Sequence, residues 1–230
     1  WATCATFSGI DGLLSADGGN GIDNGTSGGG SGGGGRIAVN YGGLGTVSGM
    51  RFSAVPSTTG FRLATPGDVG AARLGTVRFP NTALLGTNMS AIAGYIVVPG
   101  FTSWNPASLL ITNALVGFPG AFNLSVAGNM VITGASAGLV MDTGAVVSCG
   151  GNLVLAGGGH LRMYAAVTNS TPQQYGSLLS VTGQVTIGGS SWIYPYAHAT
   201  NGGAVLLRMG SLDVAETGGI KADQAGYPHG

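Results

Sequence analysis

Four segments in the second half of the chain share one pattern centred on a glycine. They read LSVAGNMVI, VSCGGNLVL, LSVTGQVTI and LLRMGSLDV, and their shared glycines are Gly128, Gly151, Gly183 and Gly210. Apolar residues recur two and four positions after each glycine and, in the first three copies, two and four positions before it. Alternation with a period of two is typical of a β-strand with one buried face. The pattern therefore predicts short strands in this half of the chain.

The spacing of the copies indicates how these strands are arranged. The four glycines are 23, 32 and 27 residues apart, and no helical pattern lies between them. Recurrence of this kind is expected when coils of chain stack and equivalent side chains form ladders. In the fourth copy Arg208 occupies a column that is otherwise apolar. A second apolar position follows each glycine by ten or eleven residues, at Leu139, Leu161, Ile193 and Ile220.

We therefore expect an all-β fold, a parallel β-solenoid or β-helix with glycine-rich loops. The uneven spacing leaves a β-sandwich as the alternative. Residues 1–35 are expected to hold an N-terminal strand and a glycine-rich tract, residues 36–120 an irregular β region, and residues 121–230 the solenoid coils, all within one continuous domain. Further strands are expected at 36–41, 50–55, 73–79, 91–98 and 109–116, between prolines and glycines.

Composition limits the partners and the compartment. Hydrophobic residues make up 44% of the chain, enough for a packed core although 46 of the 230 residues are glycine. Eight basic and eight acidic residues cancel, so nucleic acid is not an expected partner. The sequence contains no run of 18 apolar residues, so it predicts no membrane-spanning helix. The chain begins at Trp1, as a processed secreted protein or a fragment would, and we expect an extracellular or cell-surface location.

The two ends of the chain resemble each other. LLSADGGNG near the start and GIKADQAGYPHG at the end both read as a strand with an apolar–x–Ala–Asp pattern that enters a glycine-rich turn. The shared positions are Leu14, Ala16 and Asp17 near the start and Ile220, Ala222 and Asp223 near the end. Low charge favours association, and matching ends permit head-to-tail contacts that do not close. Copies of the chain itself, or adjacent modules of a larger chain, are therefore the expected partners.

Several segments carry a resemblance to a known class of proteins. GGGSGGGGRIAV, GAARLGTVRF, the GxLxV strands and GGIKADQAGYPHG resemble very large glycine-rich surface proteins of environmental bacteria. The resemblance covers most of the chain and is weakest between residues 45 and 70. It implies tandem β-solenoid-like modules, secretion and an adhesin-like role at a cell surface or in a matrix. It implies no catalytic residues.

The run WIYPY, residues 192–196, is the main candidate for ligand binding. Alternation places Trp192, Tyr194 and Tyr196 on one face, with Ile193 and Pro195 on the other. An aromatic face can stack on surface glycans or pack against a neighbouring subunit. An aromatic ladder inside the solenoid is the alternative interpretation.

The sequence offers little support for metal or catalytic chemistry. GGNGID, which ends at Asp23, matches a glycine-rich calcium repeat, but only one copy occurs and Gly25 stands where a large apolar residue is needed. Asp213 and Glu216 are the only close carboxylates in the repeat region, and Asp213 is expected to face solvent. HExxH and CxxC are absent from the sequence. We therefore expect no enzyme activity and no cofactor.

The two cysteines of the chain allow two interpretations. Cys149 shares a column with Val126 and Val181, which predicts a buried, inert thiol, although a disulfide with Cys4 is an alternative.

The first functional hypothesis is a structural module that assembles head to tail into a filament, sheath or surface adhesin. A carbohydrate-binding adhesive module is the alternative, and a polysaccharide-degrading β-helix enzyme the third.

Overall fold

The computed structural model describes residues 1–21, 32–57, 73–168, 174–198 and 202–223. The described residues form β-strands and no helix, so none of them belongs to a helix that could cross a membrane. Their strands pair in parallel, so the predicted all-β character is confirmed. Sandwiches are built from antiparallel sheets, and these pairings do not favour that alternative. The chain divides into two compact units, residues 1–85 with 91–100, and residues 86–90 with 101–230.

The first unit contains two rows of parallel strands. One row has the order β1–β3–β5–β7, and in the other β4 pairs with both β2 and β7. The rings of Phe52 and Phe79 meet edge to face at 4.9 Å in the core of this unit. The strands are β1 (Ala2–Ile10), β2 (Leu13–Ser15), β3 (Arg36–Ser48), β4 (Arg51–Ser53), β5 (Thr76–Arg78) and β7 (Ile92–Val97).

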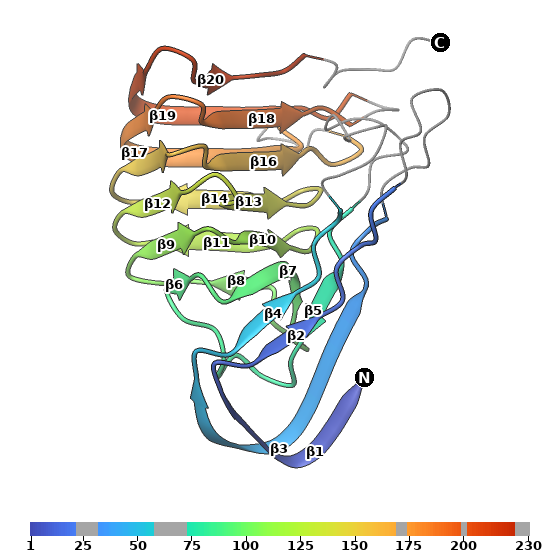
Figure 1. Ribbon diagram of the computed structural model, residues 1–230. Coiled ribbons are helices and arrows are strands. Elements are labelled where there is room, and N and C mark those ends of the chain that lie inside the picture. The colour runs from blue at the N-terminus through green and yellow to red at the C-terminus, as the bar shows by residue number, and fades with distance from the viewer. Residues whose placement is uncertain (22–31, 58–72, 169–173, 199–201, 224–230) are drawn as a thin grey trace. The chain divides into compact units, whose positions relative to one another are not determined.

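The second unit is a stack of layers, in which each layer is a succession of short strands that pair with those of the next layer (Figure 1). β6 (Asn88–Met89) pairs with β9 (Leu109–Thr112). Layer 1 is β8 (Ser103–Trp104), β9 (Leu109–Thr112) and β10 (Leu115–Phe118); layer 2 is β11 (Asn123–Val126), β12 (Met130–Thr133) and β13 (Gly138–Met141); layer 3 is β14 (Val146–Cys149), β15 (Leu153–Ala156) and β16 (His160–Tyr164). Layer 4 is β17 (Ser177–Ile187) and β18 (Trp192–Tyr196), and layer 5 is β19 (Val205–Val214) and β20 (Gly219–Ile220).

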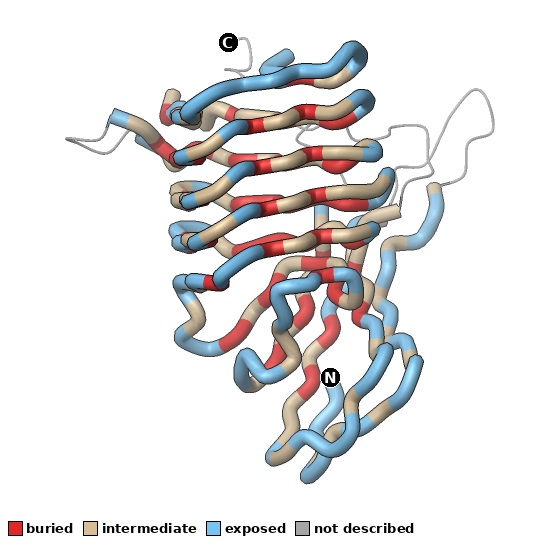
Figure 2. Tube along the Cα trace, turned by 90° about the vertical axis from the view of Figure 1, so that its left-hand side faces the viewer, coloured by how far each residue is buried: buried red, intermediate tan, exposed pale blue. Residues whose placement is uncertain are grey.

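The two ladders predicted after the shared glycines are confirmed. Met130 pairs with Leu153, Leu153 with Val185 and Val185 with Leu212. The second ladder runs through Leu139, Leu161, Ile193 and Ile220. In layers 2 to 4 the members of both ladders are fully buried, because alternate residues of each strand point into the core. Figure 2 shows these buried positions recurring at the same place in successive layers.

The shared glycines stand where neighbouring layers come too close for a side chain. A Cβ on Gly128 would lie 2.8 Å from the Ala107 carbonyl oxygen, and one on Gly183 would lie 2.8 Å from the carbonyl oxygen of Gly151. Real Cβ atoms essentially never approach backbone within 3.0 Å. The shared glycines therefore recur in the sequence because the layers come into close contact at these positions.

The asparagines that follow Gly128 and Gly151 form a second kind of ladder. The backbone N–H of Asn152 donates to Oδ1 of Asn129 at 2.9 Å, and the N–H of Gln184 donates to Oδ1 of Asn152 at 2.9 Å. Each side chain thus satisfies a backbone donor of the following layer at the corner, where strand pairing is interrupted.

Two details of the sequence prediction are wrong. The pairing of β17 with β19 shifts register between Val181 and Gln184, so Met209, rather than Arg208, pairs with Val181. Arg208 pairs with Ser180 instead and is exposed, so the apolar column continues through the fourth copy. The strand expected at 109–116 is two strands, β9 and β10, because Asn113 adopts a positive φ of 51° between them.

Candidate functional site

The last layer of the second unit presents an unpaired strand edge. β19 pairs with β17 and β20 pairs with β18, and no strand of the described residues pairs with their other sides. Such an edge carries a row of backbone N–H and C=O groups that can pair with a further parallel strand. Figure 2 shows that this layer, at the C-terminal end of the stack, is largely exposed.

The side chains on this edge belong to the core ladders. Leu212, Val214 and Ile220 expose 47%, 43% and 39% of their surfaces. Their partners one layer below, Val185, Ile187 and Ile193, expose none. The three exposed residues therefore stand at positions that are core wherever another layer follows, and we call them the edge cluster.

The first unit has an open strand edge of its own. β1 pairs with β3, and β2 pairs with β4, while no described strand of this unit pairs with the outer sides of β1 and β2. Trp1, Ile10 and Leu13 are large apolar residues that are exposed along these two strands. Ala2 pairs with the buried Val39, so the core pattern extends to this edge as well.

The N-terminal member of the two similar end segments is covered by a neighbouring strand. Leu14 pairs with Phe52 of β4, and the Asp17 carboxylate accepts hydrogen bonds from Ser53 Oγ at 2.6 Å and from the N–H of Val55 at 2.9 Å. Ser15 Oγ donates to the same carboxylate at 3.0 Å. Burial raises the pKa of Asp17, but these three hydrogen bonds outweigh it and hold the pKa below its usual value.

The C-terminal segment has its neighbour on the preceding side only. Ile220 pairs with Ile193, and the backbone N–H of Lys221 donates to the Ile193 carbonyl at 2.9 Å. Ala222 is exposed, and the exposed Asp223 carboxylate lies 3.8 Å from Lys221 Nζ. In the first unit the aspartate of this pattern contacts the next strand of its row, whereas Asp223 contacts no further layer within the described residues.

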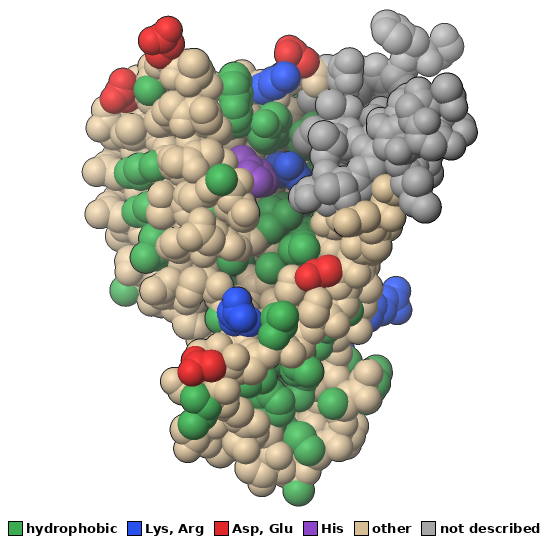
Figure 3. Space-filling model, in the orientation of Figure 1, with side chains coloured by type: hydrophobic (Ala, Val, Ile, Leu, Met, Phe, Trp, Pro, Cys, Tyr) green, Lys and Arg blue, Asp and Glu red, His purple; other side chains and the backbone are tan. Residues whose placement is uncertain are grey.

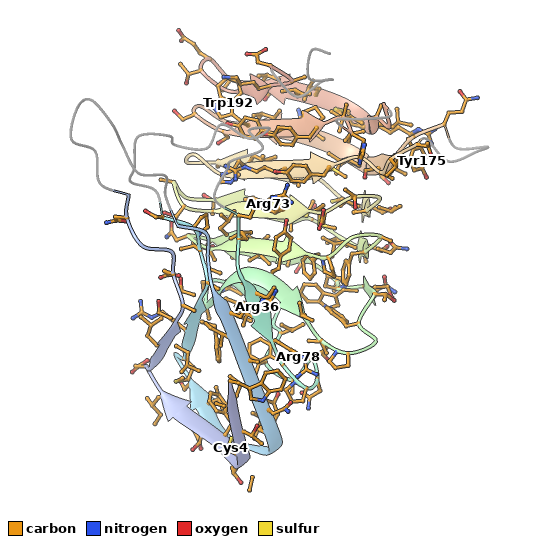
Figure 4. All side chains as sticks on the ribbon, turned by 90° about the vertical axis from the view of Figure 1, so that its right-hand side faces the viewer. Cys4, Arg36, Arg73, Arg78, Tyr175 and Trp192 are labelled. Atoms are coloured by element: carbon orange, nitrogen blue, oxygen red, sulfur yellow. The ribbon has the colours of Figure 1, made fainter. Side chains whose placement is uncertain are left out.

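The aromatic residues of β18 lie on the outer face of the second unit. The rings of Trp192 and Tyr194 are 6.5 Å apart, and those of Tyr194 and Tyr196 are 6.3 Å apart with an angle of 11° between their planes. Trp192, labelled in Figure 4, and Tyr194 are half-buried, whereas Tyr196 is buried and stacks on Tyr164 at 4.7 Å. Burial, together with the neighbouring Tyr164, raises the pKa of Tyr196.

β16 adds a second row of functional groups, which the alternation in the sequence did not reveal. His160, Arg162 and Tyr164 pair with Trp192, Tyr194 and Tyr196. Burial and the charge of Arg162 lower the pKa of His160 to about 4, so its imidazole is neutral at pH 7. HLRMY and WIYPY begin 32 residues apart, the spacing between the second and third copies of the glycine pattern, and this register is the signal that could have found the row.

The remaining sequence candidates lie apart from these features. Asp213 pairs with Thr186 and is exposed, and Glu216 is exposed in the turn after β19. Asp23 lies outside the described residues, and within the described ranges no three His, Cys, Asp or Glu side chains gather as a metal site would need.

Both cysteines are free thiols. Cys4 is half-buried on β1 (Figure 4), and Cys149 is buried. Cys149 pairs with Val126 and Val181, as the column predicts.

No family model matches the chain, and no curated protein or solved structure is significantly similar to it.

Proposed function

We propose that the chain is a parallel β-solenoid module of an extracellular or cell-surface structural protein, which extends by adding layers end to end. The observation that carries the proposal is the edge cluster, because its members occupy ladder positions that are fully buried in the preceding layers. An exposed, long, apolar strand edge favours pairing with another chain. A further layer would bury the edge cluster and pair the free groups of β19 and β20.

The proposed occupant is the edge formed by β1 and β2 of a second copy. That edge is also unpaired within its unit, runs parallel to its neighbours and exposes apolar side chains. β1 is a nine-residue strand followed by the short β2, just as the ten-residue β19 is followed by the short β20. A contact between two different ends of identical chains is heterologous, and repeated contacts of this type give open filaments.

Asp223 gives the proposed contact a specific polar component. In the first unit, Asp17 accepts from the hydroxyl of Ser53, the residue that pairs with Ser15. A strand that pairs with β20 in the same manner would place a residue opposite Lys221, and β2 offers Ser15 at the position that matches Ser53 in β4. We therefore expect Asp223 to accept hydrogen bonds from the incoming layer, with Leu14 packed near Ile220.

The composition is consistent with this role. Charged residues make up 7% of the chain and the net charge is zero, so electrostatic repulsion between copies is weak. Ladder contacts and backbone pairing need no catalytic residue or cofactor. The proposed activity is mechanical, and resemblance to large glycine-rich bacterial surface proteins supports the proposed location.

The test is self-association of the purified chain and of an edge variant. We expect the wild-type chain to form elongated particles by electron microscopy and larger species by light scattering as its concentration rises. Leu212→Asp places a charge on the edge and should keep the chain monomeric. Ser136→Asp, at an exposed turn of layer 2, introduces the same charge away from the edge and should assemble like the wild type. A wild-type chain that stays monomeric across concentration and salt would refute the proposal.

A further inference from the structure

The outer face of β16 and β18 concentrates polar groups that lack partners. Among the described residues, the buried side-chain nitrogen and oxygen atoms without a hydrogen-bond partner are Nε2 of His160 and Nε of Arg162. Both belong to one pair of residues on a single strand, β16. Buried polar atoms are nearly always hydrogen-bonded, so the Nε of Arg162, whose guanidinium lies beside the Tyr194 ring, is the atom here whose missing partner a bound ligand could supply.

Arg162 also lacks an opposite charge. Its guanidinium lies 5.8 Å from the centre of the Tyr194 ring, a cation–π contact. The ion pair between Lys221 and Asp223 is the only one among the described residues, so no carboxylate there neutralises Arg162. His160 is neutral at pH 7 and adds no charge. The site therefore has one partly desolvated positive charge, which favours an anion.

The neighbouring side chains hold the cluster in place. The imidazole of His160 meets Tyr194 edge-on at 6.4 Å, and a Cβ on Gly138 would lie 2.5 Å from His160 Nε2. Gly138 thus leaves the space that the imidazole fills. On the other side of the row, Tyr164 and Tyr196 stack on each other. Arg162 and Tyr194 are therefore fixed between packed neighbours, as a preformed binding site requires.

Trp192 and Tyr194 supply an apolar surface beside this charge. Their half-exposed rings lie next to each other on β18, and Gly219, which pairs with Trp192, adds no side chain over it. Figure 3 shows a His side chain and a Lys or Arg side chain beside hydrophobic side chains on the face where β13, β16 and β18 lie. Aromatic side chains that combine an apolar ring with a polar, hydrated group suit ligands that have both apolar and polar parts.

We propose that this face binds an anionic saccharide, with Arg162 contacting the carboxylate or sulfate group and Trp192 and Tyr194 packing against the sugar ring. A bare inorganic anion would use the guanidinium but leave the two rings without a role. A neutral sugar would use the rings but leave Arg162 unpaired. The site lies on a lateral face rather than on the edge of β19 and β20, so the inference is independent of the proposed assembly.

The experiment is calorimetric titration of the full chain with three matched hexasaccharides, of galacturonic acid, sulfated galactose and galactose. We expect one or both anionic hexasaccharides to bind, with affinity that falls as salt is added, and the neutral one not to bind measurably. Binding of the galacturonate alone identifies a carboxylate ligand, and binding of the sulfated sugar alone identifies a sulfate ligand. Failure of both anionic sugars to bind the folded chain would overturn the proposal.

Two arginine variants separate this site from nonspecific attraction. Arg162→Gln should weaken binding at least about tenfold, as expected for loss of hydrogen bonds to a charged group. Arg78, in the first unit, also lies over an aromatic ring, 5.5 Å from that of Trp1, and Arg78→Gln should leave binding unchanged. If Arg162→Gln binds as the wild type does, or if Arg78→Gln weakens binding equally, the assignment is wrong. Circular dichroism of each variant confirms that it is folded.

Discussion

The side chain of Asn152 accepts a hydrogen bond from the backbone N–H of Gln184, 32 residues later in the chain, at 2.9 Å. Asn152→Ala leaves this N–H without its partner at the corner between layers 3 and 4. We expect the variant to lose about 1 kcal/mol of unfolding free energy, the usual contribution of one such hydrogen bond. Urea denaturation measures the loss, and Asn152→Asp, which keeps an acceptor at this position, should recover part of it.

The glycine column predicts a steric effect at the same corner. A Cβ on Gly151 would clash with the side-chain oxygen of Asn129 and lie 2.8 Å from the carbonyl carbon of Gly128. Gly151→Ala should therefore destabilise the chain by about 1–3 kcal/mol, as overpacking does. Gly43 has no atom within 4 Å of an added Cβ, so Gly43→Ala is the control and should be neutral or slightly stabilising. Equal loss in both variants would show that the close contact at Gly151 is not what constrains this position.

The strand register was predictable because the residue types that determine it recur along the sequence. Gly128, Gly151 and Gly183 are forced by close contact between layers, and the apolar residues on either side are forced by burial. Both constraints act on residue type, so they can be read from one sequence. The shift that places Met209 opposite Val181 was not predictable, because an irregularity inside β17 and β19 changes pairing without changing composition.

The outer face was predicted less well than the core. Alternation placed Trp192 and Tyr194 together, but it did not identify His160 and Arg162 as their neighbours. Outward positions tolerate many residue types, so neighbouring layers share no pattern there. Knowledge of the 32-residue offset between layers 3 and 4 is needed to bring the two strands together.

The loss of unfolding free energy on truncating a ladder residue should depend on the layer in which the residue lies. Leu153 is fully buried between Met130 and Val185, and Leu153→Ala should cost about 2–5 kcal/mol. Leu212 belongs to the same ladder but is half-exposed in the last layer, so Leu212→Ala should cost less than about 1.5 kcal/mol in the monomer. Thermal unfolding at low protein concentration compares the two. A similar loss in both would mean that a further layer already covers Leu212.

The two thiols should differ in reactivity. Burial raises the pKa of Cys149, and its Sγ lies 3.2 Å from the carbonyl oxygen of Gly128, so the reactive thiolate is both scarce and inaccessible. We expect iodoacetamide to modify Cys4, which is half-buried on β1, well before Cys149 in the native chain. Mass spectrometry of the digested protein measures both rates, and denaturation in urea should make them similar. Fast native labelling of Cys149 would contradict its place in the core column.

Asp17 should make stability depend on pH in one direction. Burial alone would raise its pKa in the folded chain, but the hydrogen bonds from Ser53, Val55 and Ser15 outweigh burial and lower the pKa. A group with a lowered folded pKa stabilises the fold above its unfolded value, near 3.8, and that contribution is lost as pH falls through the folded value. Asp17→Asn should therefore be less stable than the wild type at pH 7, and the difference should shrink towards pH 3.

Urea midpoints at both pH values measure the effect of Asp17. Asp213→Asn, which removes the same charge from an exposed position on β19, is the control for the change in net charge. A gap between Asp17→Asn and the wild type that stays constant with pH would mean that the Asp17 carboxylate does not hold the turn after β2 to β4.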